Sequence, residues 1–406
     1  MELDKHSIWI GGFILSCFSL FVALVPIYVP IFWIFTVMSL WFFLSEKSKV
    51  IDTRALVLIV LALSFMGLAS FIFFKYREQS SFSIYFKILT NYSFFAAAVL
   101  MLAVVRLRTY LKWFEALFIT VLVLSFLQVL GKVIWFNLWM LPFSIEDSSD
   151  AFAISQGITL FGNAQKNIWA TKIAFFGSLY FSACYFRIFR CSSMLWHFLI
   201  AMWVFTLFYI ASRTGQVVMV LFFLGLFWYS VIKKLPWYWR ILMVFAFCIF
   251  LWLFVPWFIE RLLRLDESVF DVAAQGHGGD GFKARIKLWI YLLTHLSDFN
   301  HFRGNGVMFL DHFFEGVFYE SNIHNVFATI WIDLGLLGFL LFLTLAARVL
   351  GLVGASSSFF VLVGIPFLAS LMVQYLGYDN DLVVYLSLAL LLADLHFNYF
   401  RKQELV

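Results

Sequence analysis

Long runs of apolar residues, separated by short polar stretches, recur along the whole chain. A helix needs about 17 to 25 consecutive apolar residues to cross a hydrocarbon core of about 30 Å. About twelve runs approach this length. They predict helical spans over residues 8–25, 28–44, 55–74, 84–105, 113–134, 168–186, 195–211, 216–232, 241–258, 325–345, 358–376 and 382–400. We therefore expect an all-α integral membrane protein with about 12 transmembrane helices.

The connections between these runs alternate in their content of Lys and Arg. If the N-terminus is cytoplasmic, every second connection is cytoplasmic as well. These connections carry Lys47, Lys49, Arg54, Arg106, Arg108, Lys112, Arg187, Arg190, Lys233, Lys234, Arg240, Arg348, Arg401 and Lys402. Because Lys and Arg are enriched on the cytoplasmic side of membrane proteins, we expect both termini in the cytoplasm. The first run is not followed by a small-residue cleavage site, which indicates a retained helix.

Composition agrees with this picture. Hydrophobic residues make up 64% of the chain and charged residues 13%, which excludes a soluble domain. The net charge of +5 follows mostly from the cytoplasmic connections, and no basic, aromatic-rich soluble face suggests nucleic-acid binding. The four cysteines lie in or beside the apolar runs, so no disulfide is expected in the outer connections. No linker or internal repeat divides the chain, and residues 1–406 are expected to form a single membrane domain.

One connection, residues 259–323, is far longer than a turn and is predicted on the outer side. Within it, residues 282–296 place Ile286, Trp289, Leu293 and Leu296 at helical spacing. This pattern predicts an amphipathic helix on the outer membrane surface. Because long loops usually carry function, we expect the functional site here.

Two arginines are candidate ligands for an anion. Arg213 interrupts the apolar stretch 195–232, where an unpaired guanidinium costs about 2.5 kcal/mol or more. Its alternative role is to reach the lipid headgroups from a helix end. Arg285 lies at the start of the predicted surface helix, where free backbone N–H groups attract anions. Its alternative is a solvated basic face that it would share with Lys283 and Lys287.

His324 directly precedes the run 325–345. The positive end of a helix favours a neutral imidazole, which a general base near pH 7 requires. The alternative is an interfacial histidine that only hydrogen-bonds a loop. Asn322 and Asn325 flank it and are candidate helix caps or ligands for sugar hydroxyl groups.

Two other sequence patterns do not indicate a nucleotide-binding or metal-binding site. The string 276–283 lacks the features of a P-loop, since its Lys is displaced, no Ser or Thr follows and no strand precedes it. Asp379 and Asp381 have the spacing by which some membrane glycosyltransferases hold a divalent metal. They fill a short connection, however, where a hydrated turn is expected. His277, His295, His301 and His312 lack a close i, i+4 pair with a carboxylate, so no metal site is expected there. We expect no cofactor.

The run HNVFATIWIDLGLLGFLLF (324–342) resembles the O-antigen ligase and polymerase superfamily, in which His-Asn is followed by an acidic residue and by Gly-x-x-Gly. A Gly-x-Gly turn precedes it, as in that family, here Gly304 to Gly306. The element SRTGQ (212–216) is similar to the family's Ser-Arg-Thr element. FGNAQKN (161–167) resembles its Gly-then-Asn stretch. The resemblance covers roughly residues 155–345.

Two positions depart from the family's pattern. Asp333 stands where the family often has Glu, and Ile323 stands where it commonly has Pro or another small residue. The first change is expected to be tolerated if the acid is structural. The second has little consequence.

The resemblance implies a metal-independent, glycosyltransferase C-like enzyme in the bacterial inner membrane, with a long periplasmic loop over its site. Such enzymes transfer a glycan from undecaprenyl diphosphate to an acceptor, which for the ligase is the sugar core of lipid A. His324 would then be the general base, and Arg213 and Arg285 would bind the diphosphate. Further substrate contacts are assigned to Asn167, Lys283, Asn322 and Asn325.

Other functions stay open at this point. O-antigen polymerases often have a Gly eleven residues after an outer-loop Arg, whereas positions 224 and 296 are both Leu, which favours a ligase. A protein O-oligosaccharyltransferase would differ only in its acceptor. A flippase or transporter for lipid-linked sugars would bind phosphate without chemistry, and it would more often show Gly- or Pro-broken spans in matching halves.

Overall fold

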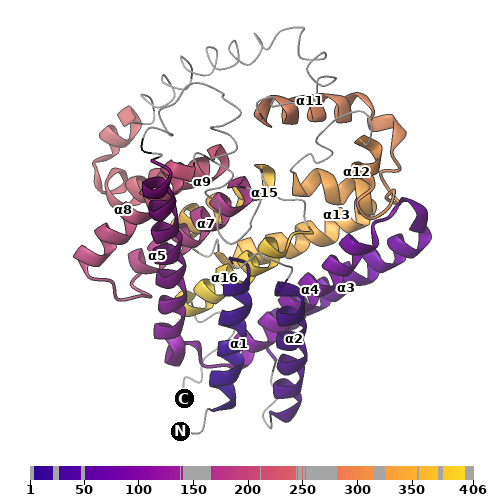
Figure 1. Ribbon diagram of the computed structural model, residues 1–406, viewed down its shortest axis with the longest axis horizontal. Coiled ribbons are helices and arrows are strands. Elements are labelled where there is room, and N and C mark those ends of the chain that lie inside the picture. Colours follow the sequence, from indigo (N-terminus) through magenta and orange to yellow (C-terminus); the bar gives the residue numbers. More distant parts are fainter. Residues whose placement is uncertain are drawn as a thin grey trace.

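The structure of the chain is a computed structural model, and all of its regular secondary structure is helical in the part that it describes (Figure 1). The described residues are 4–21, 27–46, 51–137, 139, 166–210, 212–243, 245, 249, 252, 281–314, 325–353, 356–373 and 378–397.

Eight helical segments in this part are long and apolar enough to cross a membrane. They are α2 (Tyr28–Ser45), α3 (Thr53–Lys75), α4 (Phe82–Val104), α5 (Leu111–Trp135) with the turn η2 (Leu107–Tyr110) before it, α8 (Ser193–Ile210), α9 (Arg213–Ser230), α13 (Val326–Val353) and α16 (Asn380–Phe397). By helix length and hydropathy the chain is a multi-pass membrane protein, as the apolar runs predicted.

Three further predicted spans form helices that fall short of these criteria. Helix α1 (Lys5–Ser19) has 15 residues. Helix α7 (Lys166–Tyr185) has 20 residues but contains two lysines and several hydroxyl side chains, which lower its hydropathy. The run 358–376 is divided into α14 (Ser357–Phe359), the π-helical turn η9 (Phe360–Gly364) and α15 (Ile365–Val373). Most of the predicted span 241–258 lies outside the described residues.

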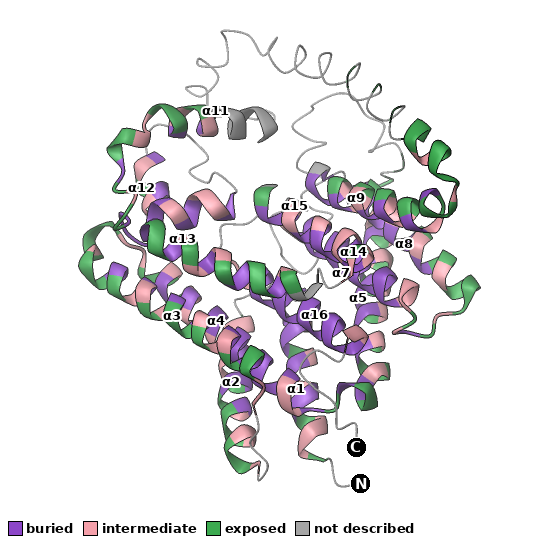
Figure 2. Cartoon of the chain, turned by 180° about the vertical axis from the view of Figure 1, so that it is seen from behind, coloured by how far each residue is buried: buried purple, intermediate pink, exposed green. Residues whose placement is uncertain are grey.

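Helix α16 lies at the centre of the bundle, and α4 and α7 pack beside it. Every residue of α16 from Asp381 to Leu395 is buried, whereas only 22% of α2 and 33% of α3 are buried (Figure 2). The peripheral helices expose large apolar side chains such as Trp41, Phe71 and Phe74. This distribution is typical of a helix bundle whose outer surface faces lipid.

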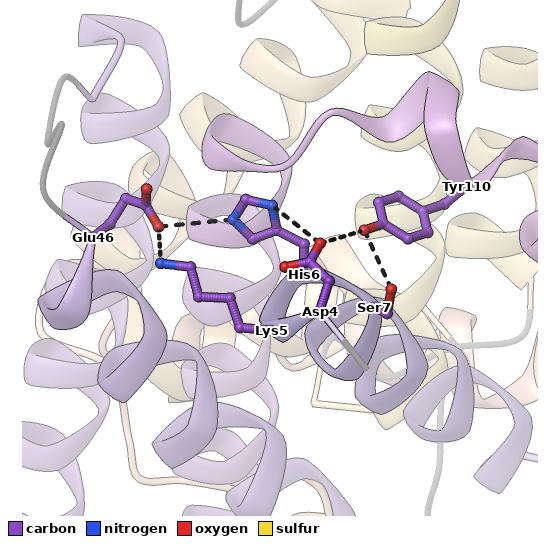
Figure 3. A network of polar contacts seen from close by, with 6 residues as sticks. All are labelled: Asp4, Lys5, His6, Ser7, Glu46 and Tyr110. Atoms are coloured by element: carbon purple, nitrogen blue, oxygen red, sulfur yellow. Dashed lines mark hydrogen bonds and ion pairs between the residues drawn. The ribbon is translucent and has the colours of Figure 1, made fainter. Parts of the chain in front are cut away.

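Contacts between helix ends show which of them lie together at each end of the bundle. At one end, Lys5 forms an ion pair with Glu46 and the Tyr110 hydroxyl donates to Asp4 Oδ2 (3.2 Å), which joins the start of α1 to the end of η2 and to the end of α2 (Figure 3). We call this the Lys5 end. At the opposite end, which we call the Asp379 end, Lys87 near the start of α4 lies 2.7 Å from Asp379.

This grouping agrees with the alternation of Lys- and Arg-rich connections. The connection after α2 and the connection before α5, both predicted to be cytoplasmic, meet at the Lys5 end. Residues 378–381 and the connection between α3 and α4, both predicted on the outer side, lie at the Asp379 end. Which end faces the cytoplasm stays a prediction.

Candidate functional site

Helix α13 is broken at Gly335. Its backbone angles there are φ 71° and ψ −174°, a combination that only glycine adopts readily. The break divides α13 into a short first part, residues 326–334, and a long second part. The sequence predicted one continuous span over residues 325–345, with Gly335 inside it. Instead, Gly335 ends one helical segment so that another part of the chain can dock into the break.

The docked part is the turn at Gly304, Asn305 and Gly306. The backbone N–H groups of Asn305 and Gly306 donate to the Asp333 carbonyl (3.0 and 3.2 Å), and Asn305 Nδ2 donates to the Ile332 carbonyl (2.7 Å). The last carbonyl groups of a helix have no hydrogen-bond donor within that helix. The turn supplies the donors that Ile332 and Asp333 lack at the end of the first part of α13. Beyond the break, the Leu336 N–H donates to the His301 carbonyl (2.8 Å). The turn thus binds both sides of the break.

The carboxylate of Asp333 anchors the same junction. It is fully buried and accepts hydrogen bonds from Met308 N (2.9 Å), Leu310 N (3.4 Å) and the Tyr378 hydroxyl (3.0 Å). Burial, together with the charge of Asp333, holds the pKa of Tyr378 well above its usual value, so this phenol stays a donor. Asp333 therefore has a structural role. Under this condition, Asp is expected from the sequence to be tolerated at a position where the family often has Glu.

Two Lys–Asp pairs connect the start of α16 to its neighbours. Lys87 of α4 donates to Asp379 Oδ1 (2.7 Å). Lys172 of α7 lies 3.2 Å from Asp381 Oδ1, an ionic contact without hydrogen-bond geometry, and it donates to the Leu20 carbonyl (3.0 Å). The Lys172 and Asp381 side chains are 6% and 2% exposed. The expectation of a hydrated turn is therefore wrong for Asp381, because bundle packing removes it from water and Lys172 compensates its charge.

The starts of α7 and α9 also meet. A Cβ atom on Gly215 would lie 3.0 Å from Ala170 Cβ, so the glycine of the SRTGQ element allows this close approach. The hydroxyl of Ser212, the N-cap residue of α9, is buried and makes no capping hydrogen bond. Among the described residues, neither this hydroxyl nor the indole nitrogen of Trp169 has a hydrogen-bond partner.

Four of the candidate residues from the sequence lie near the starts of three helices. Arg213 opens α9, Asn167 lies in the first turn of α7, and Lys283 and Arg285 lie in α11 (Gly281–Thr294), but the side chains of these four lie outside the described residues. His324 and Asn322 lie outside them entirely. Their roles stay predictions.

Asn325, which follows His324, is described and buried. Its Oδ1 accepts from Ala328 N (2.9 Å), and its Nδ2 donates to the Met372 carbonyl at the end of α15 (3.3 Å). Of the two roles expected from the sequence, the helix cap is confirmed. Its role as a sugar ligand stays a prediction.

Helix α11 forms where the sequence predicted a helix, and it has a buried face that the predicted apolar stripe did not include; its place on the membrane surface stays a prediction. Leu288 and Leu292 of α11 are buried in a cluster that includes Phe314 of α12 (Phe309–Phe314) and Ile332 of α13. Leu293, assigned to the membrane-facing side, is 58% exposed. The sequence pattern marked only one apolar stripe, whereas α11 has two, and residues of α12 and α13 pack on the second one.

Sequence reasoning missed Tyr378, Lys172 and Asn91, whose Nδ2 donates to the Tyr378 carbonyl (2.8 Å). The position of Lys172 carried a usable signal. A lysine inside a predicted span requires a partner, and Asp381 was an available acid on the same predicted side of the membrane. Tyr378 and Asn91 carried no comparable signal.

No protein-family model matches the chain, and no curated protein shows significant sequence similarity to it. The resemblance to the O-antigen ligase and polymerase superfamily therefore rests on its short motifs and on their order along the sequence.

Proposed function

We propose that the protein is an O-antigen ligase of the bacterial inner membrane. It transfers a glycan from undecaprenyl diphosphate to the lipid A-core oligosaccharide on the periplasmic face. In this proposal the chain has twelve spans and both termini in the cytoplasm, so that the Asp379 end of the bundle faces the periplasm.

The observation that carries the proposal is a continuous series of contacts joining the motif-bearing elements at the Asp379 end. The start of α9 packs on the start of α7 through Gly215. Lys172 links α7 to Asp381 of α16, and Tyr378 links the start of α16 to Asp333. The turn at Gly304 to Gly306 is bonded to the same part of α13. Segments separated by more than a hundred residues thus converge on the first part of α13, at its end near Asp333.

The chemistry requires few groups. The bond between the anomeric carbon and the phosphate oxygen breaks, its electron pair stays on the diphosphate, and the acceptor hydroxyl of the core sugar attacks the carbon. Arg213 and Arg285 stabilise the charge that grows on the phosphate oxygens, and His324 takes the proton of the attacking hydroxyl. Asn167, Lys283, Asn322 and Asn325 orient the two substrates. The diphosphate donor is already activated, so the reaction needs neither ATP nor a metal.

The two Lys–Asp pairs support the metal-independent form of this proposal over the metal-binding one. The Asp379 and Asp381 carboxylates each lie against an ammonium group, Lys87 and Lys172 respectively. A divalent cation at these two carboxylates would have to displace both lysines. A strong requirement of the transfer reaction for Mn²⁺ or Mg²⁺ would reverse this argument.

The test is transfer by the purified protein in lipid vesicles, with undecaprenyl diphosphate-linked glycan as donor and rough lipopolysaccharide as acceptor. Wild type forms glycan-bearing lipopolysaccharide. Arg213→Ala and Arg285→Ala each lower the rate by about 100- to 1000-fold, and His324→Ala lowers it by about 100- to 10,000-fold. A correctly folded variant with near-wild-type activity would remove that residue from the site. Wild-type protein that elongates a lipid-linked glycan instead is a polymerase.

A further inference from the structure

The turn that follows α9 gathers exposed cations and exposed aromatic rings. It consists of η5 (Ile232–Lys234) and a short helical segment that begins after Pro236. Lys233, Lys234 and Arg240 supply three positive charges within eight residues. Three neighbouring rings are largely exposed: Trp237 (71%), Tyr238 (54%) and Trp239 (48%).

No acid neutralises these cations along the sequence. Not one Asp or Glu occurs between Asp150 and Glu260. Among the described residues, Lys5, Lys87 and Lys172 each pair with a carboxylate, whereas no ion pair is found for Lys233, Lys234 or Arg240. Within the described part of the chain, the turn therefore presents positive charges without a compensating carboxylate.

Local contacts hold these cations in defined places. Ile232 is buried and anchors the turn. The ammonium group of Lys233 lies 5.0 Å from the centre of the Tyr229 ring, a cation–π contact. Arg240 Nε donates to the Leu235 carbonyl (2.8 Å), which fixes the guanidinium while its terminal nitrogens have no partner in the described part of the chain. A planar guanidinium held in this way can bind two phosphate oxygens at once.

We propose that this turn is a binding site for an anionic phospholipid. Lys233, Lys234 and the free edge of Arg240 hold the headgroup phosphate, and Trp237 and Trp239 lie at the boundary between headgroups and acyl chains. Indole rings prefer that boundary because one side is apolar and the N–H is polar. Lys and Arg beside a membrane surface attract anionic lipids. The inference does not depend on the proposed transferase activity.

The test uses the full-length protein, purified and delipidated in a zwitterionic detergent and titrated with phosphatidylglycerol or phosphatidylcholine. Native mass spectrometry counts the bound lipids. Wild type binds phosphatidylglycerol in preference to phosphatidylcholine, and the double variant Lys233→Gln, Lys234→Gln binds phosphatidylglycerol at least about tenfold more weakly. Adding Arg240→Gln weakens binding further. The charge-retaining variant Lys233→Arg, Lys234→Arg binds as wild type does.

The matched control lies in another turn of the same kind. Lys75 lies 4.8 Å from the centre of the Tyr76 ring, and Arg77 follows in the 3₁₀ turn η1 (Arg77–Gln79). Lys75→Gln, Arg77→Gln removes the same charge and keeps wild-type binding. Any one of three results would overturn the proposal. These are an equal loss of phosphatidylglycerol binding in both double variants, equal binding of the two lipids by wild type, and no loss of binding in Lys233→Gln, Lys234→Gln. Circular dichroism and size-exclusion chromatography confirm that each variant is folded.

Discussion

Gly304 and Gly335 pack backbone to backbone, and both have positive φ angles, 73° and 71°. A Cβ atom on Gly335 would lie 2.5 Å from Gly304 N, and one on Gly304 would lie 2.4 Å from the Asp333 carbonyl oxygen. Neither residue can therefore carry a side chain without separating the turn from the broken helix. The contact fixes where the first part of α13 points, and with it the position of its start at Val326.

Gly335→Ala is expected to destabilise the protein. The backbone conformation alone costs about 1 to 3 kcal/mol for a residue other than glycine, before the overlap of the new methyl group with Gly304 is counted. Thermal unfolding in detergent measures the loss. Gly351→Ala is the matched control, because it lies in the same helix and a Cβ atom there would meet no atom within 4 Å. Equal stability of the two variants would show that the turn does not dock as described.

Removal of the Asp333 carboxylate is expected to destabilise the protein more than removal of the Tyr378 hydroxyl, which donates a hydrogen bond to it. Asp333→Ala leaves Met308 N, Leu310 N and the Tyr378 hydroxyl without their acceptor, and each unsatisfied buried donor costs about 1 to 3 kcal/mol. Tyr378→Phe removes one of these hydrogen bonds. In a double-mutant cycle of unfolding free energies, Tyr378→Phe should then have little effect when Asp333 is already Ala. Strictly additive effects would argue against the contact.

Lys172→Met is expected to lower stability by about 3 to 5 kcal/mol, because it leaves Asp381 buried and unpaired. Adding Asp381→Leu to this variant should recover most of the loss, since two neutral side chains need no compensation. Lys87→Met serves as the comparison. Its partner Asp379 is 17% exposed, so water replaces part of the lost interaction and the effect is smaller. Denaturant unfolding in detergent gives all three values, and a double variant no more stable than Lys172→Met would contradict the pairing.

The ion pair at the Lys5 end predicts a pH-dependent contribution to stability. The hydrogen bond from Lys5 lowers the pKa of Glu46 below its usual value of 4.5, and the nearby His6 ring, 3.7 Å away, acts in the same direction. A lowered pKa in the folded state adds stability above pH 4.5, and this stability is lost as the pH falls through the folded-state pKa. Lys5→Gln should therefore be less stable than wild type at pH 7, and the difference should be smaller at about pH 3. A stability difference that is the same at both pH values would exclude this ion pair as its cause.

The outline of the fold was readable from the sequence because membrane helices need long apolar runs. Lys and Arg along the connections also predicted which helix ends meet, as the Lys5–Glu46 and Lys87–Asp379 pairs show. Helix α7 was predicted as a span even though its hydropathy is modest. Its lower hydropathy reflects its place inside the bundle, where helices tolerate polar residues that find partners.

The break in α13 could not be predicted in the same way. A glycine inside an apolar run is compatible with close helix packing, a kink or a break, and the choice depends on what contacts it. Here the deciding partner is Gly304, which lies far away in sequence, and its approach depends on the hydrogen bonds of Asn305. The buried face of α11 was missed for a similar reason. Its Leu288 and Leu292 pack on residues from two other helices, so only the tertiary structure separates this stripe from the exposed one.

The most direct test of the proposed function is to delete the gene in its host and to analyse the glycolipids. The account predicts complete O-antigen stranded on undecaprenyl diphosphate, together with lipid A-core that carries no O-antigen, and restoration by wild type but not by His324→Ala. Lipid A-core that carries a single repeat unit would mean a polymerase, and lipid-linked units that never reach the outer face would mean a flippase. Either result would contradict the assignment as a ligase.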